Sequence, residues 1–233
     1  MDSLELYSLA QQDYHELEIL LGEKPDLVKK KDNNERSLLH WAALAGREQL
    51  VAQLLASGTT FLNDGDDTNA TPQILATLGG HLNVLKLLVA KGAKIDDKNW
   101  HGHTSLQYAC SKGHRDIVEY LLSLGADVNV RDDRNDTCLH RLASTGRCDI
   151  LEMLLTCPQK LDLDAQNAEG DTPLHVACQE KQLECVARLV EHGASVNILN
   201  KDKKSPLEYC PPRVRQEILE KLNLVTAETP ASS

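Results

Sequence analysis

Apolar residues in this chain occur in pairs that recur three to four residues apart, and polar stretches rich in Asp, Asn and Gly separate the groups of pairs. This spacing places apolar side chains on one face of a helix, so it predicts short helices with a buried stripe. The pairs assigned to the second helix of successive units are Leu50-Val51 with Leu54-Leu55, Val84-Leu85 with Leu87-Leu88, Ile117-Val118 with Leu121-Leu122, Ile150-Leu151 with Leu154-Leu155, and Cys185-Val186 with Leu189-Val190.

A Ser or Thr that can cap the first helix of a unit recurs at a nearly constant interval. These positions are Ser37, Thr71, Thr104, Thr137, Thr172 and Ser205, which are 34, 33, 33, 35 and 33 residues apart. Glycines follow nine residues after four of the caps (Gly46, Gly80, Gly113 and Gly146) and 21 residues after four of them (Gly58, Gly92, Gly125 and Gly193). Glycine in these places is expected to end each helix and turn the chain.

The fifth cap begins the stretch Thr172-Pro173-Leu174-His175-Val176-Ala177, which matches the T-P-L-H-x-A signature of an ankyrin repeat, a unit of about 33 residues. We therefore predict an all-α ankyrin-repeat solenoid of about seven helix-pair repeats with β-hairpin fingers. The units begin near residues 3, 37, 71, 104, 137, 172 and 205 and form a single array over residues 1–225. The first unit lacks a capped tetrad, as expected for a terminal repeat that faces water on one side. Its two apolar helices are expected around Leu6, Leu9 and Ala10, and around Leu17, Ile19, Leu20 and Leu21. Residues 226–233 have nothing to bury and are expected to form a disordered tail.

Composition narrows the class of partner. The formal net charge is −10, which disfavours a nucleic-acid partner because cations supply most of that affinity. No apolar run reaches the roughly 20 residues that span a bilayer, and no signal peptide is visible, so no membrane contact is expected. The seven cysteines are expected to be buried thiols in a reducing compartment. The sequons at Asn69 and Asn135 are interpreted as accidental, because their Thr residues already serve as helix caps.

Candidate catalytic and metal-binding residues are few. The chain has no phosphate-binding glycine loop and no nucleophile elbow, and no nucleophile is paired with a base, so no enzyme activity and no cofactor are expected. His40, His140 and His175 lie three residues after a cap, where we expect local hydrogen bonds. His175 and Cys178 share a helical face, but a second Cys/His pair that would complete a zinc site is not evident. His101 and His103 are expected to lie on a solvated turn.

The remaining hypothesis is that the chain binds another protein. In a stack of repeats, the groove is lined by the residue before each cap, the fourth residue after it, and the end of the first helix. Aromatic residues and Arg, which are enriched among interface hot spots, occur at several of these positions. The predicted partner-binding residues are Arg36, Trp41, Asp67, Trp100, His103, Tyr108, Lys112, Asp136, Arg141, Asp171, Glu180 and Lys204. The alternative is that these scattered charges only keep the protein soluble and bind no partner.

Several stretches resemble the gankyrin family of ankyrin-repeat proteins. They are Arg36–Ala42, Tyr108–Lys112, Leu139–Arg141, Gly170–Glu180 and Gly193–Asn197 with Asn200-Lys201 and Ser205–Leu207. The resemblance covers about Leu4 to Leu222, and much of it is shared by ankyrin repeats in general. It implies a monomeric, cytoplasmic and nuclear assembly chaperone of the proteasome regulatory particle, which holds the C-terminal domain of one AAA ATPase subunit. By the same resemblance, Arg36 and Lys112 would meet carboxylates, Asp67 and Glu180 would meet basic side chains, and Trp41 would lie in the same surface.

Two alternatives accompany this hypothesis. The gankyrin family carries an L-x-C-x-E stretch linked to retinoblastoma-protein binding, which brings in cell-cycle regulators as further partners. Here that stretch is Val176–Glu180, with Val in place of Leu and in a helix, so we do not expect that binding. The second alternative is an adaptor or inhibitor in signalling or ubiquitin-ligase regulation. We expect repeats to fill the chain and leave no room for an F-box, SOCS-type or kinase segment, which disfavours the adaptor.

Overall fold

The computed structural model describes residues 3–12, 14–58 and 61–228. Contacts divide the chain into two compact units, Met1–Asp127 and Val128–Ser233, which are taken separately below. Every regular element in the described ranges is a helix, which confirms the predicted all-α class. No helix in these ranges is both long and apolar enough to cross a membrane.

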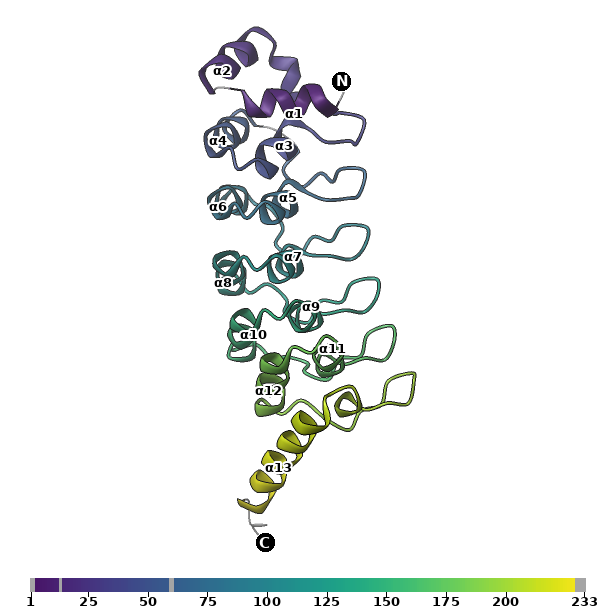
Figure 1. Ribbon diagram of the computed structural model, residues 1–233. Coiled ribbons are helices and arrows are strands. Elements are labelled where there is room, and N and C mark those ends of the chain that lie inside the picture. The colour runs from purple at the N-terminus through teal and green to yellow at the C-terminus, as the bar shows by residue number, and fades with distance from the viewer. Residues whose placement is uncertain (1–2, 13, 59–60, 229–233) are drawn as a thin grey trace. The chain divides into compact units, whose positions relative to one another are not determined.

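The first unit consists of short helices in two stacked rows (Figure 1). In one row α3 packs on α1 and α5, and α5 packs on α7; in the other row α4 packs on α6. In three repeats the two helices also contact each other: α3 with α4, α5 with α6, and α7 with α8. The elements are α1 (Ser3–Gln11), α2 (Tyr14–Glu23), the 3-10 helix η1 (Pro25–Lys29), α3 (Leu38–Leu44), α4 (Glu48–Ala56), α5 (Pro72–Leu78), α6 (Leu82–Ala90), α7 (Ser105–Lys112) and α8 (Arg115–Ser123).

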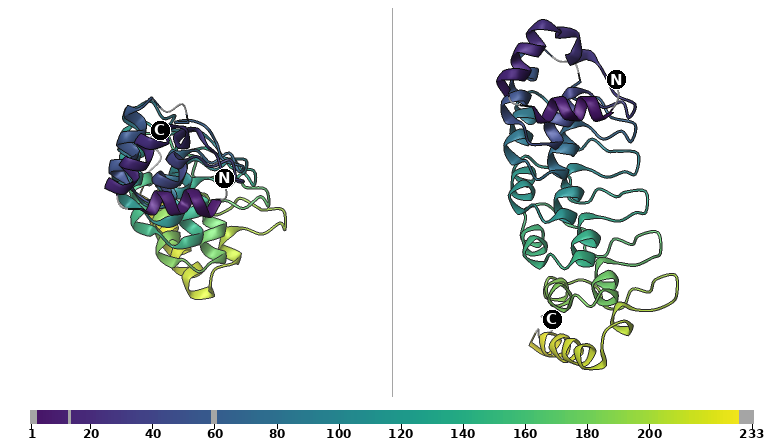
Figure 2. Two further views of the ribbon diagram at one scale, coloured as in Figure 1. Left: turned by 90° about the horizontal axis from the view of Figure 1, so that it is seen from above. Right: turned by 45° about the horizontal axis from the view of Figure 1, so that its top comes forward.

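The second unit repeats this arrangement and ends differently (Figure 2). Helix α11 packs on α9 and α12, while α10 packs on α9 and α12. In the last repeat the first helix shortens to a 3-10 turn, η2, because Pro211 and Pro212 follow it closely. The elements are α9 (Cys138–Thr145), α10 (Cys148–Leu155), α11 (Pro173–Gln179), α12 (Leu183–Glu191), η2 (Pro206–Glu208) and α13 (Pro212–Glu228).

The predicted second-helix stripes form the core. At least three residues of each stripe are buried, among them Val84, Leu85 and Leu88 at 0 % exposure. The helix starts are also confirmed: Thr71 Oγ1 accepts a hydrogen bond from the Ile74 backbone N–H, and five other caps form reciprocal capping boxes. In the first unit the predicted second helix is α2, whose buried stripe runs through Leu17 and Leu21 while Ile19 is 52 % exposed.

Two glycines show why the helix-ending positions are restricted. Gly46 and Gly92 have φ of 71° and 96°, which ordinary residues adopt at a cost of about 1 kcal/mol or more. A Cβ at Gly46 would also lie 2.4 Å from the His81 ring, whereas a Cβ at Gly92 would meet nothing within 4 Å. His81 Nε2 lies 3.1 Å from the Leu44 carbonyl oxygen, so moving the ring breaks a contact between repeats.

We therefore expect Gly46→Ala to lower the free energy of unfolding by about 1 kcal/mol more than Gly92→Ala does, because only Gly46 combines backbone strain with a displaced ring. Chemical denaturation of both variants measures this difference. Equal losses would show that the His81 ring moves aside without cost.

The fingers and the tail differ from the sequence-based picture. The described fingers contain no strand, and one isolated antiparallel bridge, Lys31 to Ser37, is what remains of the predicted β-hairpins. Each finger keeps one backbone hydrogen bond across its base, for example from the Asp32 N–H to the Arg36 carbonyl at 2.9 Å, and the Asp32 side chain accepts from further N–H groups of the finger. Helix α13 continues to Glu228, so residues 226–228 of the predicted tail are helical. Residues 229–233 lie outside the described residues.

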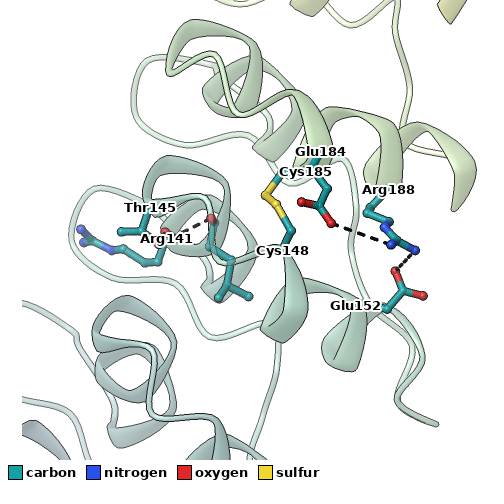
Figure 3. Close-up of a disulfide and its surroundings, with 8 residues drawn as sticks. Arg141, Thr145, Cys148, Glu152, Glu184, Cys185 and Arg188 are labelled. Atoms are coloured by element: carbon teal, nitrogen blue, oxygen red, sulfur yellow. Dashed lines mark hydrogen bonds and ion pairs between the residues drawn. A yellow bond between two sulfur atoms is a disulfide. The ribbon is translucent and has the colours of Figure 1, made fainter.

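The expectation that the cysteines would be thiols is wrong for two of them. Cys148, at the start of α10, and Cys185, near the start of α12, form a disulfide with a Cα–Cα distance of 5.2 Å (Figure 3). Arg188 lies beside it and bridges Glu152 and Glu184, with nitrogen–oxygen distances of 3.6 and 3.9 Å. The second helices of two successive repeats are thus joined covalently.

Candidate functional site

Each finger is closed by the oxygen of its first side chain. Asp32 Oδ1 accepts hydrogen bonds from the backbone N–H groups of Asn34 and Arg36, both at 2.9 Å. Such turns are typical of Asp and Asn. The fourth residue of each finger has a positive φ, for example Glu35 and Gly102. Equivalent contacts two and four residues along the chain define the other fingers, which we number 66–70, 99–103, 132–136, 167–171 and 200–204.

A side chain in the following helix, or directly after it in the case of Tyr209, holds four of these fingers at their first residue. In each case the two residues are nine positions apart, because the holding residue is the fourth after the cap. We call these side chains latch residues. The contacts run from Trp41 Nε1–H to Asp32 (2.9 Å), from Asn99 Nδ2–H to Tyr108 Oη (3.0 Å), from Arg141 to Asp132, and from Asn200 Nδ2–H to Tyr209 Oη (3.0 Å).

Neighbouring fingers within a unit are also joined to each other. In the first unit the Asp67 N–H donates to the Asn34 carbonyl, and the Trp100 N–H donates to the Thr68 carbonyl, both at 2.9 Å. Arg36 Nε donates to Asp66 at 2.9 Å. In the second unit the corresponding contacts are Ala168 N–H to the Arg134 carbonyl, Lys201 N–H to the Glu169 carbonyl, Asn167 to Asp136, and Asn200 to Asp171.

The three cap histidines make the local hydrogen bonds that the sequence predicted, and they also bridge repeats. The Ser37 N–H donates to His40 Nδ1 at 3.2 Å, so Nε2 carries the proton and donates to the Asp64 carbonyl at 3.0 Å. His140 and His175 repeat this geometry. Burial lowers the pKa of His40 from 6.5 to about 4 and lowers the pKa of His140 and His175 as well. These imidazoles are neutral structural links.

Asp66 shows how charge is held inside a finger. Burial alone would raise the pKa of this carboxyl, but hydrogen bonds from Thr68, Ala70 and Arg36 outweigh burial and lower it. The side chain of Asp66 is fully covered, while that of Arg36 is 20 % exposed and also lies over the Trp41 ring at 4.9 Å. Arg36 is therefore committed to contacts within the chain.

The twelve predicted partner-binding residues fall into two groups. Seven of them make contacts that hold or join fingers: Arg36, Trp41, His103, Tyr108, Asp136, Arg141 and Asp171. The other five are exposed: Asp67, Trp100 and Lys112 in the first unit, and Glu180 and Lys204 in the second. The nine-residue spacing between the first Asp or Asn of a finger and a later Trp, Tyr or Arg is a sequence signal that would have assigned three of the seven, Trp41, Tyr108 and Arg141, to the first group.

The exposed group offers charge of both signs and one large apolar side chain. Trp100, at a finger tip, is 69 % exposed. Lys112 and Glu180 occupy the same place in their repeats, eight residues after the cap at the end of the first helix. Lys204 lies with its ammonium group 5.2 Å from the Tyr209 ring centre. Within the described part of the chain, no three His, Cys, Asp or Glu side chains converge as metal ligands would. Each unit thus exposes charged side chains, and the first unit also exposes a large aromatic one.

Comparison with known proteins agrees with this architecture. The ankyrin-repeat family model matches in three copies, over residues 6–99, 39–132 and 139–223. The chain belongs to the ankyrin-repeat family, and it is a protein-binding domain of that family. The crystal structure of the human ASB11 ankyrin-repeat domain is similar, with a TM-score of 0.82 and 26 % identity over 97 % of this chain and 99 % of that one.

Two curated relatives match over shorter stretches. The human transient receptor potential cation channel subfamily A member 1 is 28 % identical over 185 residues, which is 79 % of this chain and 14 % of the channel. The 26S proteasome non-ATPase regulatory subunit 10 of Dictyostelium discoideum is 40 % identical over 63 residues, which is 27 % of either chain. The chain therefore matches only about a seventh to a quarter of the length of these relatives.

Proposed function

We propose that this ankyrin-repeat domain is a non-enzymatic assembly chaperone of the proteasome regulatory particle. In this role it acts as a monomer in the cytoplasm and nucleus and binds the C-terminal domain of one AAA ATPase subunit. The observation that carries the proposal is the 40 % identity to a 26S proteasome non-ATPase regulatory subunit. That match covers 27 % of the chain, and the exposed side chains also support the proposal.

The exposed side chains suit a partner that carries both charges. Lys112 ends α7 and would meet a carboxylate, while Glu180 follows α11 and would meet a basic side chain. Asp67 and Lys204 add one charge of each sign to the fingers. Charges on such a surface chiefly set orientation and association rate, and exposed Trp100 supplies apolar contact area. The seven residues that hold or join the fingers would position the exposed side chains without contacting the partner directly.

Charge reversal tests the proposal. Lys112→Glu and Glu180→Lys should each weaken binding to the isolated ATPase C-terminal domain by about tenfold, which corresponds to about 1.4 kcal/mol, and raised salt should weaken it further. Glu119→Lys is the matched control, because Glu119 is exposed on the second-row helix α8 and should leave binding unchanged. Titration calorimetry with the purified partner domain measures all three variants.

The adaptor alternative has a separate outcome. In that case affinity purification recovers signalling or ubiquitin-ligase components and no proteasomal ATPase subunit. If Glu180→Lys weakens that recovery, the chaperone proposal is wrong and the adaptor hypothesis replaces it. Unchanged affinity in both charge-reversal variants would instead place the contact on another surface.

A further inference from the structure

Two pairs of cysteines in the Val128–Ser233 unit each join neighbouring repeats. The first pair, Cys148 and Cys185, forms the disulfide between α10 and α12. The second pair, Cys178 in α11 and Cys210 just after η2, has thiol sulfurs only 2.7 Å apart. An S–S bond is about 2.0 Å long, so closing the second pair requires the sulfurs to approach by about 0.7 Å.

The segments that carry the second pair are already held together. Helix α11 packs on η2, and both thiols are buried, with Cys178 at 0 % and Cys210 at 8 % exposure. His175 Nε2 donates to the Lys204 carbonyl at 3.1 Å, so the cap of α11 is fixed to the last finger. Because these contacts hold the backbone on both sides, a bond between the sulfurs needs no rearrangement of the repeat.

The two thiols also differ from each other. The hydrogen bond that they share, together with burial, raises the pKa of Cys178. In the thiol pair the Cys210 S–H donates to Cys178 Sγ; once Cys210 ionises, the Cys178 thiol can donate to the Cys210 thiolate instead, which lowers the pKa of Cys210. A thiolate is the form that reacts with oxidants, and Cys210 is also the more exposed of the two sulfur-bearing residues, at 8 % against 0 %, so we assign the first reaction to Cys210.

We propose that Cys178 and Cys210 are a second oxidation site, in which a peroxide converts the contacting thiols into a disulfide between α11 and the last repeat. The Cys210 thiolate attacks hydrogen peroxide and becomes a sulfenic acid, and hydroxide leaves and takes up a proton to form water. The Cys178 sulfur then attacks the Cys210 sulfur. The S–S bond forms, the S–O bond breaks, and the hydroxyl group leaves as a second water with the Cys178 proton. Two thiols lose two electrons, and one peroxide gains them.

Oxidation at this site would restrict the movement of the last repeats relative to each other. With both bonds present, α10 is tied to α12 and α11 is tied to the segment that connects η2 to α13. Glu180, at the end of α11, and Lys204, in the last finger, then belong to one covalently closed part of the unit. This proposal does not depend on the identity of the partner, because its test measures cross-linking and stability.

The test uses the full chain, fully reduced with a phosphine and then treated with hydrogen peroxide. Remaining thiols are alkylated under denaturing conditions, and peptides are mapped by mass spectrometry. A linked Cys178–Cys210 peptide, lighter than its two thiol halves by two hydrogens, is expected. In a Cys148→Ser/Cys185→Ser background, peroxide should raise Tm by about 5–10 °C. Cys157→Ser, at a half-buried cysteine outside both pairs, should keep the peptide and the shift.

Trapping with dimedone tests the order of reaction. In Cys178→Ser, peroxide should leave a dimedone adduct on Cys210, whereas in Cys210→Ser no adduct should form on Cys178. If Cys178 and Cys210 are both recovered as alkylated thiols after oxidation, or are found linked to other cysteines or to a second chain, the proposed site does not exist. This mapping is done on the unmutated chain and therefore does not depend on a variant that folds.

Discussion

Asp66→Ala is expected to lower the free energy of unfolding by about 3–5 kcal/mol, as removal of one partner from a buried ion pair does. Asp66 Oδ1 accepts hydrogen bonds from the Thr68 N–H and the Ala70 N–H at 2.9 Å and from the Thr68 hydroxyl at 2.6 Å, while Oδ2 accepts from Arg36 Nε at 2.9 Å. Alanine leaves two backbone N–H groups, the Thr68 hydroxyl and a guanidinium without this acceptor. The finger loses its side-chain closure and one of its links to the preceding finger, while the bond from the Asp67 N–H to the Asn34 carbonyl remains.

Two further variants separate these effects. Asp66→Asn keeps an oxygen for the two N–H groups, as Asn99 does in the next finger, so it should cost about 1–2 kcal/mol by weakening the contact with Arg36 alone. Asp67→Ala removes the exposed carboxylate of the neighbouring residue and should change the free energy of unfolding by less than about 0.5 kcal/mol. Urea denaturation of the three proteins gives the comparison. A loss below about 1 kcal/mol in Asp66→Ala would refute the role given to this carboxylate.

Acidification from pH 7 to pH 5 is expected to destabilise the protein, with about 2 kcal/mol lost through His40 alone. The pKa of His40 is about 4 in the folded chain and 6.5 in the unfolded one. Between these values the unfolded chain binds a proton that the folded chain does not, so stability is complete above pH 6.5 and falls as the pH drops toward 4. Protonation at Nδ1 would set a new N–H against the Ser37 N–H that now donates to it.

His40→Gln is the matched variant for this pH dependence. Gln107 already occupies the equivalent position of another repeat, where its Oε1 accepts from the Thr104 N–H at 3.1 Å. The variant should keep the cap but lose about 2 kcal/mol of the difference in unfolding free energy between pH 7 and pH 5. Denaturation curves at several pH values test this expectation. An unchanged pH slope would mean that His40 is not the group that titrates. His140 and His175 should contribute in the same direction.

The sequence predicted the repeats well because their determinants are local. A cap such as Thr71, a glycine such as Gly46, and the stripe through Leu85 each act within a few residues, so their spacing alone indicates the fold. The fingers were less predictable, since Asp and Asn side chains replace the strand ladder with turns. The disulfide was also missed: Cys148 and Cys185 are 37 residues apart, and only the stacking of helices brings them together.

The candidate surface was predicted in part. Some side chains at outward positions bind another part of the chain instead of facing a partner. Trp41 and Arg141, for example, serve as latch residues for the fingers. A polar side chain beside a buried Asp pairs with it, because an unpaired buried carboxylate is costly. Lys112 and Glu180 lie eight residues after their caps rather than four, so they are not at the latch position and remain exposed at the ends of their helices.

The imidazoles of His40, His140 and His175 each span two repeats, since Nδ1 accepts from one cap and Nε2–H donates to the loop that leads to the next. Their Nε2 protons are therefore three natural reporters, each placed at a different boundary between repeats. Solvent exchange of one such proton, observed by NMR, records the opening of that boundary while the others stay closed. The chain thus carries a built-in readout of where it begins to come apart.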